Sequence, residues 1–166
     1  MLSLNECLKD FEEELKKGKI QKAYKGIFDF LIKIKNSLLE TNPDYYSPGR
    51  IYHGYLDISY FPVATDLLNK HQLRTAVVFD YELFQLEVWF SGRNRFILKN
   101  YWELFKKKEW EKYPLLEGVD KSYSIMKHIL RTKIDLERQE EILQIRFMIQ
   151  SLIKDVEELL KKEGHR

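Results

Sequence analysis

The sequence predicts an α+β fold: two N-terminal helices, a three-stranded antiparallel β-meander, and then three helices ending in a long C-terminal one. Apolar residues recur every three to four positions in the first forty residues and again near the C-terminus, which indicates helices at both ends. The middle of the chain instead alternates apolar and polar residues, and residues 50–113 hold 15 of the 23 aromatic side chains. With 166 residues and no linker-like segment, residues 1–166 are expected to form one domain.

The two N-terminal helices are predicted from apolar stripes separated by Gly18. The first stripe has helical spacing and consists of Leu4, Leu8, Phe11 and Leu15. The second runs from Ile20 to Leu38, and the turn-forming residues 41–49 end it.

Three strands are expected at residues 50–61, 74–79 and 83–90, with Pro62 ending the first and residues 65–70 forming a helical turn. The alternation assigns one face of each outer strand to the core. The expected core residues are Tyr52, Leu56, Ile58, Phe84, Leu86, Val88 and Phe90. The opposite, polar face is expected to carry His53, Tyr55 and Asp57 from the first strand and Gln85, Glu87 and Trp89 from the third.

Three more helices are expected at residues 93–112, at 123–130, and from a cap at Asp135 to Glu163. The last contains a heptad seam formed by Ile142, Ile145, Ile149, Leu152, Val156 and Leu159. A second apolar row consists of Leu143, Phe147, Ile153 and Leu160. The seam can pack along the first two helices, or part of this helix can pair with a second copy as a homodimer.

The composition excludes several classes of function. The single Cys7 excludes an intramolecular disulfide and a cysteine-based zinc site, and it suits a reducing compartment. There is no signal-peptide pattern and no apolar run near the ~20 residues that cross a bilayer, so we expect a cytoplasmic protein without membrane association. A net charge of +2 is too small to indicate nucleic-acid binding. No phosphate-binding glycine motif or histidine metal spacing appears, and no cofactor or metal is predicted.

The candidate site is the polar face of the sheet together with the start of the following helix. Residues 93–95 lie at the predicted helix N-terminus, where free backbone N–H groups favour an anion. The predicted site residues are His53, Tyr55, Asp57, Glu87, Trp89, Arg93, Asn94, Arg95 and Tyr101. This pattern favours a non-enzymatic binding or interaction module for an anionic or aromatic ligand over an enzyme.

Two alternatives remain open at the level of sequence. The first is a metal-dependent hydrolase of phosphoesters or nucleic acid that uses Asp57 and Glu87, although residues flanking a central strand are roughly 10 Å apart. No catalytic residue is assigned, and salt bridges from these carboxylates to Arg93 or Arg95 are the simpler explanation. The second alternative is a helix-mediated homodimer without a small-molecule site.

Two motifs carry a resemblance that spans most of the chain. They are Gly54-Tyr55-x-Asp57-x-x-Tyr60-Phe61 and Phe84-x-x-Glu87-Val-Trp89-x-x-Gly92-x-Asn94-Arg95, the second followed by Tyr101-Trp102. With them the chain resembles a family of small bacterial proteins known only as a domain of unknown function. The resemblance implies a stand-alone soluble bacterial protein and brings no activity, cofactor or catalytic residue.

Overall fold

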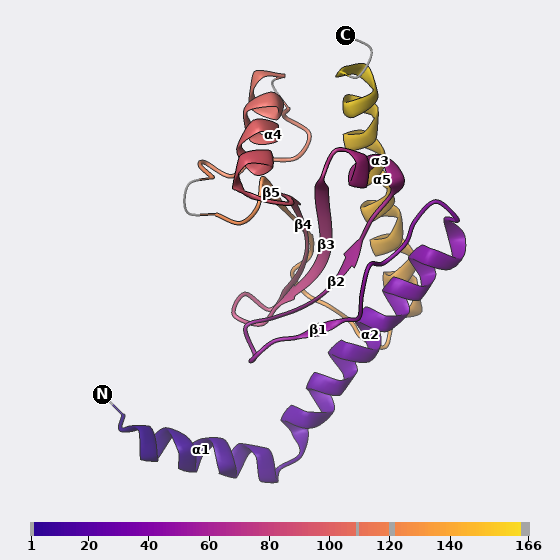
Figure 1. Cartoon of the computed structure of the whole chain (residues 1–166). Helices are drawn as coiled ribbons and strands as arrows, with labels where there is room; N and C mark the ends of the chain where they lie inside the picture. Colours follow the sequence, from indigo (N-terminus) through magenta and orange to yellow (C-terminus); the bar gives the residue numbers. More distant parts are fainter. Residues whose placement is uncertain (1, 109, 120–121, 164–166) are drawn as a thin grey trace.

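The computed structural model describes residues 2–108, 110–119 and 122–163, and it shows an α+β fold (Figure 1). The helices are α1 (Leu4–Lys16), α2 (Lys19–Thr41), α3 (Asp66–Lys70), α4 (Arg95–Lys107) and α5 (Gln139–Glu163). The strands are β1 (Tyr52–His53), β2 (Ile58–Val63), β3 (Leu73–Asp80), β4 (Gln85–Gly92) and β5 (Met126–Arg131). None of the described helices combines the length and apolar character that a membrane span requires.

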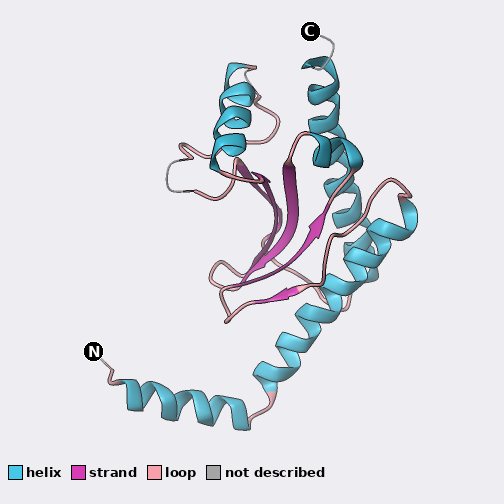
Figure 2. Ribbon diagram, viewed as in Figure 1, coloured by secondary structure: helices cyan, strands magenta, loops and turns pink. Residues whose placement is uncertain are grey.

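The strands form one antiparallel sheet in the order β1-β2-β3-β4-β5, so neighbours in sequence are neighbours in space (Figure 2). The predicted three-stranded meander is its centre, with β3 in the middle, and β1 and β5 extend it at the two edges. The register places Val77 of β3 between Phe61 of β2 and Val88 of β4. These three side chains are fully buried and point to the same face.

The core lies between this face of the sheet and the helices. The long helices α2 and α5 pack against each other, and each contacts a strand of the sheet. Of the predicted heptad seam, Ile145, Ile149, Leu152 and Val156 have no exposed surface. The seam therefore packs within this chain, against α2. The first sequence interpretation, packing along the first two helices, is confirmed for α2 and not for α1, which has no buried residue.

Helix α4 is tied to the sheet by a close backbone approach and by aromatic packing. Gly92 ends β4 directly beneath the first turn of α4, where an added Cβ would lie 2.3 Å from the backbone nitrogen of Leu98. Further along α4, the rings of Phe105 and Phe90 meet edge to face, 6.2 Å apart. The helix ends at Lys107, earlier than predicted, and residue 109 of the predicted span lies outside the described residues.

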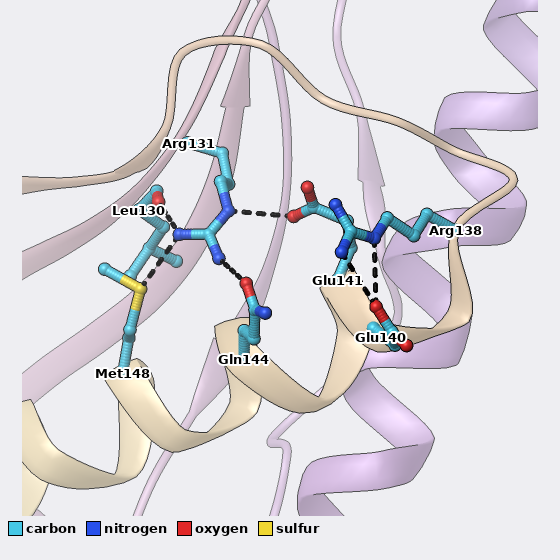
Figure 3. Close-up of polar contacts among 7 residues, drawn as sticks. All are labelled: Leu130, Arg131, Arg138, Glu140, Glu141, Gln144 and Met148. Carbon is cyan, nitrogen blue, oxygen red and sulfur yellow. Dashed lines mark hydrogen bonds and ion pairs between the residues drawn. The ribbon is translucent and has the colours of Figure 1, made fainter.

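At the β5 edge of the sheet, Arg131 binds the start of α5 (Figure 3). Its Nε donates to Glu141 Oε2 at 2.8 Å, and its two terminal nitrogens donate to Gln144 Oε1, to the Leu130 carbonyl oxygen and to Met148 Sδ. The Arg131 and Glu141 side chains are 23% and 12% exposed. This ion pair is therefore largely removed from solvent and connects an edge strand to a core helix.

The predicted helix at residues 123–130 is wrong, because residues 126–131 form strand β5. The segment pairs antiparallel with β4, and Met126 and Leu130 face the core while Lys127 and Ile129 are more exposed. This is a period of two, yet the segment is short enough to fit helical spacing as well. Backbone pairing with the edge of β4 decides between them.

The predicted strand at residues 50–61 is also wrong: it is a hairpin of β1 and β2 around a turn at residues 54–57. Leu56 in this turn has a left-handed φ of +63°. A Cβ at Gly54 would lie 2.2 Å from the backbone carbonyl oxygen of Ile58, so only glycine leaves room for the turn. The turn shifts the alternation, and Ser59, Phe61 and Val63 face the core instead of the expected residues.

Of the other residues predicted to lie in the core, some are buried as expected and others are exposed. Leu86, Val88 and Phe90 are fully buried as predicted, whereas Tyr52 and Leu56 are exposed. Phe84, expected in the core, adopts φ +52° in the β3–β4 turn and is 61% exposed. Pro62 does not end its strand, because β1 covers only the start of β2 and leaves the proline at an open edge where its missing N–H is tolerated.

Candidate functional site

The face of the sheet opposite the core contains a hollow of about 760 Å³, which we call the open-face hollow. Its floor and walls come from residues that alternate with the buried core residues of β2, β3 and β4, and from the segments that flank these strands. Its lining includes Tyr46, Tyr60, Pro62, Arg74, Ala76, Trp89, Arg93 and Tyr123.

The hollow has its floor at the smallest side chain of the central strand. Ala76 of β3 pairs with Pro62 on one side and with Trp89 on the other, so a methyl group lies between two large rings. Because side chains two positions apart on a strand share a face, Arg74 and Ala76 both point to this surface. The sequence thus leaves space in the middle of the sheet face and places a cation beside it.

Trp89, a predicted site residue, forms one wall and is held on two sides. Its Nε1 donates a hydrogen bond to Glu87 Oε2, and Glu87 Oε1 accepts a second from Gln85 Nε2. The Nζ of Lys127 lies 3.8 Å from the indole ring centroid, a cation–π contact. Glu87 is only 3% exposed and forms no ion pair within the described chain, so its role in this geometry is to fix the plane of the indole.

The hollow is positively charged. Arg74 and Arg93 line it, and none of its described lining residues is acidic. Neither guanidinium forms an ion pair with a carboxylate in the described part of the chain. Together with Tyr46, Tyr60 and Tyr123, these cations make a surface suited to a planar, negatively charged molecule.

The remaining residues predicted around the start of α4 have structural partners. Asn94 caps the helix, with its Oδ1 accepting from the Ile97 backbone N–H at 2.9 Å. Arg95 donates to the carbonyl oxygens of Val119 and Ser122, at 2.5 and 3.0 Å, and therefore holds the loop before β5.

Its guanidinium also lies 5.3 Å from the Tyr123 ring centroid. Arg95 thus contacts Tyr123, a lining residue of the hollow, and helps to hold it in place. Tyr101 shares a 2.6 Å hydrogen bond with His71 Nδ1, and neither residue lines the hollow.

The structure does not bring the three predicted residues of the first strand to the hollow. His53 faces α2, where its ring stacks on Phe28 with centroids 3.8 Å apart. Tyr55 is 96% exposed in the hairpin turn, and Asp57 belongs to the same turn. The sequence prediction placed them on the same face as Glu87 because it assumed one continuous strand where the structure has a hairpin.

This arrangement also separates the two carboxylates that a metal-dependent hydrolase would need. Asp57 lies three residues before Tyr60, the β2 residue in line with Glu87 across the sheet. Strand geometry then places their Cα atoms roughly 14 Å apart. No cluster of three or more His, Cys, Asp or Glu side chains suited to a metal occurs among the described residues.

Comparison with known proteins places this architecture in a family. A profile of the family described as Domain of unknown function (DUF7000) matches residues 4–160, nearly the whole chain. The protein belongs to the DUF7000 family. No curated protein and no solved structure gives a significant match to it.

In this DUF7000 protein, two of the predicted site residues, Trp89 and Arg93, line the hollow. Three other lining residues, Arg74, Tyr46 and Tyr123, were not predicted as site residues. Arg74 was predicted only as the first residue of the central strand, although it is exposed between buried residues. Tyr46 reaches the site through an isolated bridge to Ala64, and Tyr123 through the loop before β5. Arg74 alone carried a usable signal, a lone cation in a strand of buried residues.

Two histidines predict a pH dependence of stability. Burial lowers the pKa of His71, helped by the charge of Lys70, and burial alone lowers the pKa of His128. The folded state therefore disfavours the protonated ring, so stability is greatest above the unfolded pKa of about 6.5 and falls as the pH drops towards the folded pKa values.

We expect the melting temperature to be lower at about pH 5.5 than at about pH 7.5, and His71→Gln with His128→Gln to reduce this difference. Thermal unfolding followed by circular dichroism at the two pH values measures both quantities. An equal difference in the wild type and the double variant would contradict this origin.

Proposed function

We propose that this DUF7000 protein is a non-enzymatic binding module, and that its open-face hollow binds a small molecule with both an aromatic ring and an anionic group. The observation that carries the proposal is the composition of the hollow: four aromatic side chains and two arginines without an acidic residue. A carboxylate or phosphate would accept hydrogen bonds from Arg74 and Arg93, and the ring would lie against Trp89.

The rigidity of the site supports binding over a purely structural role. The indole of Trp89 is already fixed by Glu87 and by Lys127, so a ligand need not order it on binding. Pre-organised side chains reduce the entropic cost of association. A hollow of about 760 Å³ also lies within the size range of small-molecule sites.

The test is isothermal titration of the wild type with benzoate and with a nucleoside monophosphate, compared with inorganic phosphate and with the uncharged nucleoside. We expect the aromatic anions to bind more tightly than either partial ligand, because only they engage both the arginines and the rings. Arg74→Gln and Arg93→Gln should each weaken that binding by about tenfold or more, since each removes a charge-assisted hydrogen bond.

The matched control is Arg50→Gln, which removes an exposed arginine outside the hollow and should leave binding unchanged. Trp89→Leu should weaken binding of the aromatic anions and leave any binding of inorganic phosphate intact. The proposal fails if no aromatic anion binds, or if binding survives loss of both arginines in a folded protein.

A further inference from the structure

Helix α1 presents an apolar stripe that none of the described residues buries. Leu4, Leu8 and Phe11 are 84%, 63% and 47% exposed, and α1 has no buried residue. The helix turns at Gly18, which has φ +70°, and extends away from the sheet and from α5 (Figure 1). An isolated helix of 13 residues is marginal in water, so packing of this stripe is needed to stabilise it.

A second exposed apolar surface lies on the outer side of α5, which we call the outer row. Leu143 and Phe147 are 48% and 63% exposed, and Gln150 and Lys154 continue the row. Its steps of four, three and four residues are the same as those of the α1 stripe from Leu4 to Leu15. The two apolar residues of the row, Leu143 and Phe147, have the same four-residue step as Phe11 and Leu15 of α1, so the two helices can pack along each other there.

The two surfaces carry opposite charge. Helix α1 contains five acidic and two basic residues, a net charge of −3. Residues 142–154 of α5 contain no acidic residue, and Arg146 and Lys154 give them +2. The Nε of Arg146 is buried without a hydrogen-bond partner among the described residues, beside the exposed ring of Phe147.

We propose that α1 of one copy packs antiparallel on the outer row of a second copy of this chain, and that the exchange is reciprocal. The register opposes Leu15 to Leu143 and Phe11 to Phe147, which brings the acidic second half of α1 to Arg146. Two identical contacts related by a two-fold axis close the assembly as a dimer. The chain itself supplies both complementary surfaces, which favours a second copy over an unrelated partner.

Sedimentation equilibrium of the full chain over a range of concentrations tests this. We expect a dimer for the wild type, and a dissociation constant raised by roughly 100-fold or more in Leu8→Glu with Phe11→Glu, and likewise in Phe147→Glu. All three side chains are exposed, so the fold should survive, as circular dichroism would show. Lys9→Ala with Glu13→Ala changes α1 off the stripe and should leave the dimer intact.

A disulfide test identifies the contact directly, because Cys7 is exposed and is the sole cysteine of the chain. In the proposed register Gln150 lies opposite Leu8, next to Cys7 of the other copy. Mild oxidation of Gln150→Cys should give a disulfide-linked dimer on a non-reducing gel, and the exposed control Lys99→Cys should not.

A wild type that stays monomeric overturns the proposal. So does a disulfide in the Gln150→Cys variant that joins Cys7 to position 150 of the same chain. A dimer that is insensitive to both the α1 and the α5 substitutions also overturns it. None of these results affects ligand binding in the open-face hollow, which lies on the sheet and uses other residues.

Discussion

Gly92→Ala is expected to lower the free energy of unfolding by about 3 kcal/mol or more, the cost of forcing an added group into a site that cannot relax. A Cβ at position 92 would lie 2.3 Å from the Leu98 nitrogen, 2.8 Å from the Leu98 Cα and 2.9 Å from the Ile97 carbonyl carbon. These are backbone atoms, which no rotamer change can move. Helix α4 would have to shift, and with it the buried side chains of Leu98 and Phe105.

Urea unfolding measures this loss, and Gly118→Ala is the matched control. A Cβ at Gly118 would meet no atom of the described residues within 4 Å, and its φ is not left-handed, so we expect almost no change. Equal stability of the two variants would show that α4 does not pack on β4 as closely as the structure indicates.

The close contact between Gly92 and α4 could not be predicted from the sequence, whereas the strand and the helix that it joins could. Strands β3 and β4 and the C-terminal end of α5 follow from alternation, apolar periodicity and charge, all of which are local signals. The predicted cap at Asp135 is wrong, because α5 begins at Gln139. Strand β1 was merged with β2 into one predicted strand, and β5 was predicted as a helix. Edge strands are short and half exposed, and partner strands specify them more than their own residues do.

The candidate site shows the same limit. Glu87 and Trp89 were placed on one face correctly because they lie two residues apart on a regular strand. His53 and Asp57 were placed wrongly on that face, because the turn at residues 54–57 separates His53 from β2 and contains Asp57. Leu56 interrupts the alternation through a left-handed φ of +63°, a conformation that a leucine in the sequence does not indicate.

Arg131→Met is expected to lower the free energy of unfolding by about 3–5 kcal/mol, the cost of leaving a buried carboxylate without its cation. Arg131 connects the edge strand β5 to α5 through Glu141 at 2.8 Å (Figure 3). In the variant, the mostly buried Glu141 keeps its charge and loses its partner, and the Gln144 amide oxygen loses a donor. Urea unfolding followed by fluorescence measures the change.

The double variant Arg131→Met with Glu141→Leu distinguishes two effects of the single variant: the unpaired charge of Glu141 and the loss of the connection between β5 and α5. It should regain most of the stability, because replacing both members of a buried pair by apolar groups is often neutral. Arg138→Met is the matched control: its pair with Glu140 is exposed on the same helix end, and we expect no measurable loss (Figure 3). If the double variant is as unstable as Arg131→Met, the stability is lost because β5 is no longer connected to α5. The Arg131–Glu141 connection then matters more than the unpaired charge of Glu141.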